Sequence, residues 1–197
     1  MKRKRVIQLS SIAIFFISTL LSAEEITLSD NFESGMDKWD KPSSSAVKII
    51  DEELTNKTKY AVEVAFKEKD IEEFILSFRL KLLKKTSNEN GHFAIRINRG
   101  IGKWALYLTT SSDKAKIMSM FYENGEKKAL NRKTFAISMP VDKFMDIKII
   151  CNNDEYKLTI GKEIFLLGTA PGKGGFSLGS YRQPFAIDDL KIVYAKP

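Results

Sequence analysis

The segment Phe74-Ile-Leu-Ser-Phe-Arg-Leu-Lys-Leu82 places an apolar side chain at every second position, with Ser77, Arg79 and Lys81 between them. Successive side chains of a β-strand point to opposite faces, so this alternation predicts a strand with one face in a core and one in solvent. The segment His92 to Asn98 repeats the pattern, with apolar residues at 93, 95 and 97. The two segments predict two strands of an antiparallel sheet.

The same alternation recurs in short runs along the rest of the chain, separated by turn residues such as Asn88-Glu-Asn-Gly91. No run of ten or more residues has the 3.6-residue period of a helix. Strands of this length, each with one apolar face, favour an all-β fold: a two-sheet antiparallel jelly-roll sandwich. The further predicted strands are 60–66, 104–109, 116–122, 144–151, 156–160, 163–167, 176–178 and 185–193.

The first 23 residues have the features of a signal peptide. Lys2 to Arg5 are positively charged, Ile12 to Leu21 are mainly apolar, and Leu21-Ser-Ala23 ends in the small residues that a signal peptidase prefers. The apolar run is too short to span a bilayer as a mature helix. The sequence therefore predicts an exported protein, periplasmic or extracellular, with one domain at 24–197 and no integral membrane segment after cleavage. An uncleaved membrane anchor is the alternative.

Charge and cysteine content exclude two classes of protein. The formal net charge is +7; four positive charges and no acid lie in 1–23, which leaves 7 − 4 = +3 for the rest. Such a mild, interspersed charge does not predict nucleic-acid binding. Cys151 is the only cysteine, so no internal disulfide forms, and its apolar neighbours predict that it is buried.

Three segments together resemble the concanavalin A-like (laminin G-like) lectin/glucanase superfamily. Leu28-Ser-Asp-Asn-Phe-Glu-Ser-Gly35 followed by Trp39 is similar to the superfamily's opening motif. Phe144-Met-Asp-Ile-Lys-Ile-Ile150 with Tyr156-Lys-Leu-Thr-Ile-Gly161 resembles its late hairpin. Gly174-Gly-Phe-Ser-Leu-Gly179 with Phe185-Ala-Ile-Asp-Asp-Leu-Lys-Ile192 resembles its closing strands. The resemblance implies a jelly roll that binds or cleaves carbohydrate.

Within the superfamily, the middle of the chain is most similar to secreted domains associated with 3-keto-disaccharide hydrolase. Phe74-Ile-Leu-Ser-Phe-Arg79 and Gly91-His-Phe-Ala-Ile-Arg96 resemble two strands of that family. The family's next strand carries acidic residues, whereas Trp104 to Thr110 carries none. An activity is therefore not transferred from this resemblance.

A glycan-binding face is the first candidate site. If Phe78 and Ile95 point inward, Arg79, His92 and Arg96 lie outward, and we expect them on one sheet with Trp104 or Tyr107. Tyr181 and Arg182, in the loop before the last predicted strand, are weaker additions to this face. Aromatic rings and hydrogen-bonding groups bind the apolar faces and hydroxyls of sugars, and arginines suit acidic polysaccharides. The alternative is an ordinary solvated sheet face, with Trp104 in the core.

A structural calcium site is the second candidate, implied by the resemblance. The matching residues are Asp30, Glu33 and the carbonyl of Gly35, with Asp188 or Asp189 near the C-terminus. Hard oxygen donors from separate strands suit Ca²⁺. The alternative is that these acids cap turns or pair with lysines.

The favoured function is non-catalytic, lectin-like binding of a polysaccharide or other glycan. The first alternative is a glycoside hydrolase, since Glu68-Lys-Asp-Ile-Glu-Glu73 matches an acidic pattern of laminarinase-like enzymes. The lysines within and beside that segment instead favour a charged loop, so no catalytic residue is assigned. The second alternative is a structural or protein-interaction module of the cell envelope.

Overall fold

The computed structural model of the protein describes most of the chain after the predicted signal peptide. The described residues are 25–33, 35–40, 42–43, 45–58, 61–67, 70–84, 90–99, 102–110, 115–123, 130–137, 140–169 and 173–195. None of them lies in a helix, and hence none lies in a helix long and apolar enough to cross a membrane. The predicted signal peptide at 1–23 lies outside the described residues.

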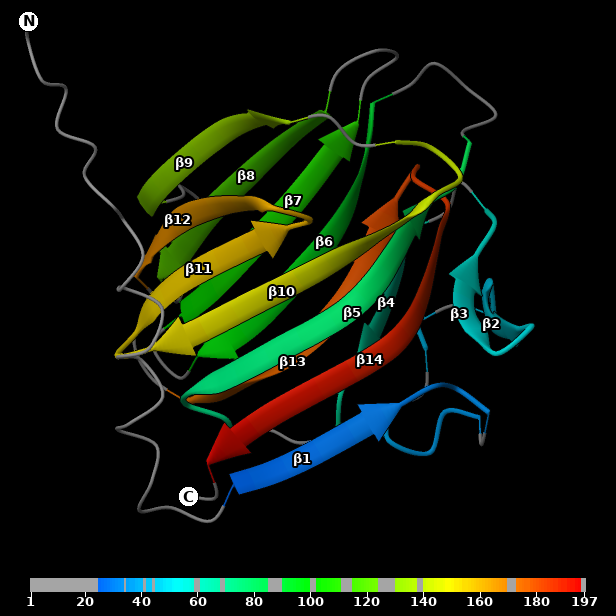
Figure 1. Ribbon diagram of the computed structural model, residues 1–197, viewed down its shortest axis with the longest axis horizontal. Helices are drawn as coiled ribbons and strands as arrows, with labels where there is room; N and C mark the ends of the chain where they lie inside the picture. Colours follow the sequence, from blue (N-terminus) through cyan, green and yellow to red (C-terminus); the bar gives the residue numbers. More distant parts are fainter. Residues whose placement is uncertain are drawn as a thin grey trace, which may run out of the picture.

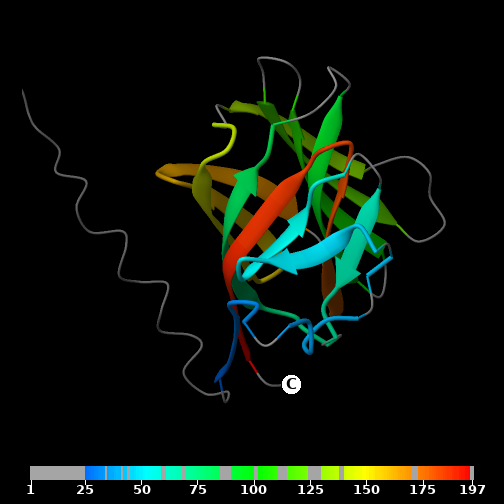
Figure 2. The ribbon, with the colours of Figure 1, turned by 90° about the vertical axis from the view of Figure 1, so that its right-hand side faces the viewer.

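The described residues form two antiparallel sheets packed face to face (Figure 1). The eight-stranded sheet, which lies in front in Figure 1, has the order β12-β11-β10-β5-β14-β3-β2, with β1 also paired to β14. Its strands are β1 (Glu25–Asp30), β2 (Val47–Ile50), β3 (Glu53–Asn56), β5 (Phe74–Leu82), β10 (Phe144–Asn152), β11 (Glu155–Ile160), β12 (Glu163–Thr169) and β14 (Phe185–Ala195). The β2–β3 hairpin, cyan in Figure 2, extends this sheet beyond β14.

The six-stranded sheet forms the second layer, with the order β4-β13-β6-β7-β8-β9. Its strands are β4 (Val62–Ala65), β6 (Gly91–Arg99), β7 (Gly102–Thr110), β8 (Ala115–Glu123), β9 (Leu130–Ile137) and β13 (Gly174–Tyr181). The prediction of a two-sheet antiparallel jelly-roll sandwich is therefore confirmed. Sequence alternation did not reveal β1, β2, β3 and β9, which are short strands or lie at the edge of a sheet.

The core fills the space between the sheets with the apolar faces of the strands. The five apolar residues at alternate positions of β5 are all buried, as are Phe93, Ile95 and Ile97 of β6, which confirms their predicted orientation. Trp104 of β7 stacks on Tyr156 of β11 across the two sheets, with ring centroids 4.3 Å apart. Burial of such rings is a large part of the free energy that holds two sheets together.

Asp30 organises one end of the sandwich. The residue is 4% exposed, and its carboxylate accepts hydrogen bonds from the Phe32 amide at 2.9 Å and from Trp39 Nε1 at 2.7 Å. The Trp39 ring then packs against Phe32, Phe66 and Phe176. Hydrogen bonds to both oxygens allow this carboxylate to be buried at little cost. The opening motif of the sequence thus has a structural role: it fixes the segment from Asp30 to Trp39 against the core.

Trp104→Ala is expected to lower the free energy of unfolding by about 3–5 kcal/mol, because it leaves a cavity between the sheets. It also leaves the Ser119 hydroxyl, which now accepts a hydrogen bond from Trp104 Nε1, without that partner. Urea denaturation followed by circular dichroism measures the change. Ile164→Ala is the control, since that side chain is 64% exposed and its loss should cost less than about 0.5 kcal/mol. Equal losses in the two variants would contradict this account of the core.

Candidate functional site

The outward face of the six-stranded sheet brings together side chains from several strands. Directly paired residues of neighbouring strands point to the same face. One row across the sheet is Tyr181–His92–Thr109, and the next is Glu63–Gly179–Ala94–Tyr107. A third row, Ser177–Arg96–Ala105, follows.

Three aromatic rings form a cluster at one end of this face. The His92 ring lies 4.9 Å from the Tyr107 ring in an edge-to-face arrangement, and 5.9 Å from the Tyr181 ring. Tyr181 is 39% exposed, and the Arg182 guanidinium lies 4.8 Å from its ring centre. The cluster presents apolar ring surface beside hydroxyl and imidazole groups, which is the chemistry that suits a sugar.

Arg96 of β6 lies beside the cluster, and its side chain extends across β13 towards β4. Its guanidinium carbon is 6.0 Å from the Tyr107 ring centre, and its Nη1 is 3.1 Å from Glu63 Oε2 on β4. Gly179 of β13 lies beneath this bridge. A Cβ there would be 3.0 Å from Arg96 Nη1 and 2.5 Å from the Val62 carbonyl oxygen, so only glycine lets Arg96 and β4 approach so closely.

The surroundings of His92 favour the neutral form of its imidazole. Burial lowers its pKa below the ordinary value of 6.5, and the positive charge of Arg96 lowers the pKa further. A neutral imidazole can both donate and accept a hydrogen bond, which suits contact with a hydroxyl group. Of the residues predicted for the glycan-binding face, His92, Arg96 and Tyr107 are brought together.

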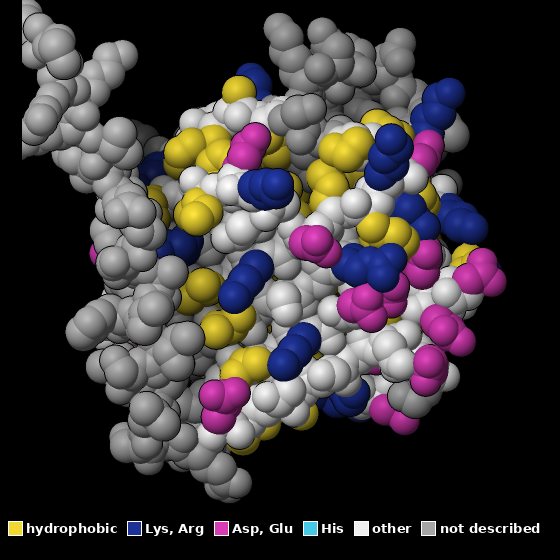
Figure 3. Space-filling model, viewed as in Figure 1, with side chains coloured by type: hydrophobic (Ala, Val, Ile, Leu, Met, Phe, Trp, Pro, Cys, Tyr) yellow, Lys and Arg dark blue, Asp and Glu magenta, His cyan; other side chains and the backbone are white. Residues whose placement is uncertain are grey.

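Arg79 does not join them, and its predicted place on the same sheet is wrong. It belongs to β5 of the eight-stranded sheet, although β5 and β6 are consecutive in the chain. Its Nη1 pairs with Asp189 Oδ2 at 2.9 Å and with Asp188 Oδ2 at 3.4 Å, and its guanidinium lies 4.4 Å from the Phe144 ring centre. Figure 3 shows the outward face of this sheet, on which acids, lysines and arginines are intermixed.

Trp104 is not part of the face either. The side chain is 1% exposed because position 104 shares the inward parity of Leu106 and Leu108. Trp104 and Tyr107 are separated by an odd number of positions along the strand, so their side chains point to opposite faces of the sheet. Tyr107 is the one that faces outward.

The four residues predicted to bind calcium do not converge on a common metal site in this structure. Asp30 is buried and hydrogen-bonded through both oxygens. Asp188 pairs with Arg79 and accepts the Asp189 amide at 2.7 Å. Among the described residues, no three His, Cys, Asp or Glu side chains are grouped so that they could hold a metal ion. Calcium binding through Asp30, Glu33, Gly35 and Asp188 stays a prediction that requires their rearrangement.

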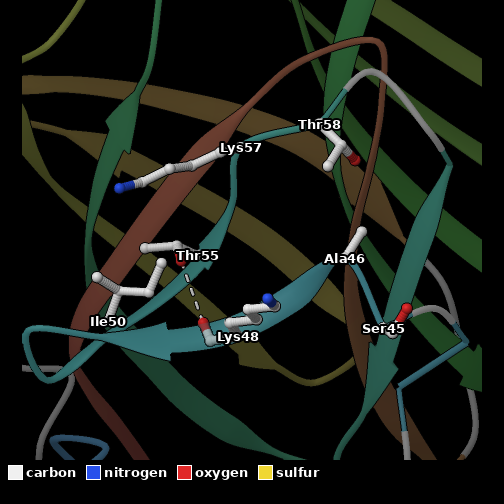
Figure 4. Close-up of a pocket in the computed structure, with 7 residues that line it drawn as sticks. All are labelled: Ser45, Ala46, Lys48, Ile50, Thr55, Lys57 and Thr58. Atoms are coloured by element: carbon white, nitrogen blue, oxygen red, sulfur yellow. Dashed lines mark hydrogen bonds between the residues drawn. The ribbon is translucent and has the colours of Figure 1, made fainter.

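A hollow at the β2–β3 hairpin is a weaker candidate. Lys48, Ile50, Thr55, Lys57 and Thr58 are among the residues that line it. Thr55 Oγ1 donates a hydrogen bond to the Lys48 carbonyl, and the two lysine side chains do not converge on one point (Figure 4). The hollow therefore lacks the concentrated charge that an anion site needs.

The two packed sheets and their order define the fold: a concanavalin A-like jelly roll, which the chain shares with a carbohydrate-binding module, a lectin-like domain and a β-glucanase among solved structures. No family model matches the chain, and no curated protein matches it.

Among solved structures, the carbohydrate-binding module CBM66 from Bacillus subtilis is 12% identical, with a TM-score of 0.60 over 79% of this chain and 96% of that chain. A legume lectin-like domain from Entamoeba histolytica is 9% identical, with a TM-score of 0.63 over 81% and 91%. The Bacillus licheniformis β-glucanase is 9% identical, with a TM-score of 0.61 over 87% and 98%. These likenesses establish the fold. The closer resemblance to 3-keto-disaccharide hydrolase domains stays a prediction.

Glu63, Ser177 and Gly179 also belong to the site, and none of them is recognisable as a site residue from the sequence. The alternation in 60–66 puts Glu63 on a solvent-facing position, but nothing local connects it with Arg96. Tyr181 and Arg182, the weaker candidates from the sequence, do lie at the cluster.

The pKa of His92 is expected to lie below 6.5, and Arg96→Gln is expected to raise it, because the variant removes one of the two causes of the shift. Since the unfolded chain binds this proton more tightly, His92 also makes the folded state less stable as the pH falls below 6.5 towards the folded pKa. The chain has one histidine, so an NMR titration reports a single imidazole. Arg79→Gln is the control and should leave the pKa unchanged. A pKa of 6.5 or above in the unaltered protein would contradict the described burial.

Calcium binding at the predicted residues requires a higher melting temperature in calcium chloride than in a chelator, because a ligand that binds only the folded state stabilises it. Asp188→Asn should remove that difference. Asp154→Asn, in the turn between β10 and β11, should retain it. Identical melting curves in the two solutions would rule out this site.

Proposed function

We propose that the protein is an exported, non-catalytic carbohydrate-binding domain that holds a glycan on the outward face of the six-stranded sheet. The observation that carries the proposal is the cluster of Tyr181, His92 and Tyr107, with Arg96 beside it. Rings supply surface for the apolar face of a sugar, while the imidazole, the phenol groups and the guanidinium bind its hydroxyls.

The small residues of this face support the same proposal. Ala94 and Ala105 point outward, yet both are 0% exposed, because the longer side chains around them cover the sheet. The groups that a ligand meets first are therefore the tips of Tyr107, Arg96 and Tyr181. A binding surface of this kind contacts an extended chain without enclosing it.

Binding is favoured over hydrolysis by the carboxylates that are present. A typical glycoside hydrolase uses two carboxyl groups on either side of the scissile bond. Among the strand residues whose side chains the structure describes, this face carries one, Glu63, which is held by Arg96 and by a hydrogen bond from the Ser177 hydroxyl. In the segment that suggested catalysis, Glu72 pairs with Lys173 and Glu73 accepts the Asn153 amide.

The carbohydrate-binding modules and lectins among the matched structures are consistent with this proposal. Export rests on the features of residues 1–23. Immunodetection of the protein in fractionated cells, with a variant that carries Asp at two positions of the apolar run 12–21 as control, tests that part.

Tyr107→Ala and Tyr181→Ala are each expected to weaken glycan binding about tenfold, because aromatic contacts carry much of the affinity of such surfaces. A screen of neutral and acidic polysaccharides with the purified protein identifies a ligand, and isothermal titration then measures the affinities. Arg79→Ala, on the other sheet, is the matched control and should bind as the unaltered protein does.

Two outcomes would count against the proposal. Absence of binding to every polysaccharide would favour a structural module of the cell envelope. Release of reducing ends from the bound polysaccharide would show an enzyme instead.

A further inference from the structure

The outward face of the six-stranded sheet carries more positive than negative charge in its described strands. Arg96, Lys103 and Lys116 point to this face, since Ile95, Trp104 and Ile117 next to them point into the core. Glu63 is the one acid among the described side chains of these strands. Positive charge on a binding surface attracts an anionic ligand and raises its association rate.

The Arg96 guanidinium is largely buried, and one of its nitrogen atoms has no hydrogen-bond partner. The side chain is 17% exposed, and its Nη1 is buried without a hydrogen-bond partner in acceptable geometry, although Glu63 Oε2 is 3.1 Å away. Proximity without alignment gives the attraction between the charges but not a directed hydrogen bond. A buried donor in this state is costly and gains from a better-placed acceptor.

Glu63 can move its side chain away from Arg96 into solvent. Its side chain is 41% exposed, and it lies on β4, the edge strand of the sheet. Rotation of the carboxylate into solvent leaves two donors facing the vacated space: the Arg96 guanidinium and the Ser177 hydroxyl, which now donates to Glu63 Oε1. A planar guanidinium binds a carboxylate or sulfate through two parallel hydrogen bonds.

We infer that Arg96 and Ser177 form a subsite for the carboxylate or sulfate group of an acidic glycan, and that Glu63 occupies this subsite in the free protein. The inference rests on the proposed function, because the aromatic cluster would hold the sugar ring next to the subsite. It adds the ligand class: glycans whose sugars carry uronic acid or sulfate groups. Glu63 acts as an internal competitor that a neutral glycan has no means to displace.

The test compares oligogalacturonate with its fully methyl-esterified form, which has the same backbone without the charge. The unaltered protein should bind the acidic form more tightly than the methyl-esterified form. Glu63→Gln should strengthen binding of the acidic form about threefold, because it removes a competing charge at a partly exposed position, and should thereby increase the preference for the acidic over the esterified form. Arg96→Gln should remove the preference for the acidic form, a loss of about tenfold. A sulfated glycan with its desulfated form repeats the comparison for the second anion.

Glu53→Gln is the matched control, since Glu53 pairs with Lys81 on the other sheet and should not alter binding. Each variant is compared at an equal folded fraction, measured by thermal unfolding. Equal affinity for the charged and neutral forms of both glycans overturns the inference but leaves the proposed function standing. The same holds if Glu63→Gln weakens binding of the acidic form. Failure of all four glycans to bind, combined with an empty polysaccharide screen, overturns both.

Discussion

Contact between the two apolar sheet faces is the constraint on which the rest of this structure depends. Rings from opposite sheets meet at Trp104–Tyr156, Phe78–Phe93 and Phe93–Phe185. Because strand side chains alternate, burying one set forces the other set outward. Placing Ile95 and Trp104 in the core thus places Arg96 and Tyr107 on the surface, so the packing of the core also determines which groups a ligand meets. A shift of one residue in β6 or β7 would exchange the site for the core.

The local period of the sequence was enough to predict most strands and the orientation of their side chains. The alternation in 74–82 and in 92–98 is long and uninterrupted, and burial follows it. Period does not determine which sheet a strand joins, because either sheet accepts the same pattern. The chain passes from β5 to β6 across the sandwich, and this crossing separates Arg79 from Arg96. Two residues predicted for different sites, Arg79 and Asp188, contact each other instead.

The candidate site was only partly predictable, since its members come from distant parts of the chain. Glu63, Arg96 and Ser177 meet because β13 lies between β4 and β6, an arrangement that follows from the completed sheet. Asp30 illustrates the converse. Its residue type and motif indicated a cation ligand, but a backbone amide and an indole N–H occupy its oxygens. Residue type indicates what a side chain can bind, and only its neighbours in space determine what it does bind.

The pairing of β1 with β14 links residues 25–30 to residues 190–195. Contacts this distant in sequence close late in folding, because the entropy of a large loop must be lost before they form. β14 also pairs with β3 and β5, so the eight-stranded sheet lacks this central member until residues 185–195 have been synthesised. A ribosome-bound chain that stops before Phe185 cannot assemble this sheet. The domain thus completes its eight-stranded sheet only after β14 has left the ribosome, and deletion of β14 removes the strand that joins β1 and β3 to β5.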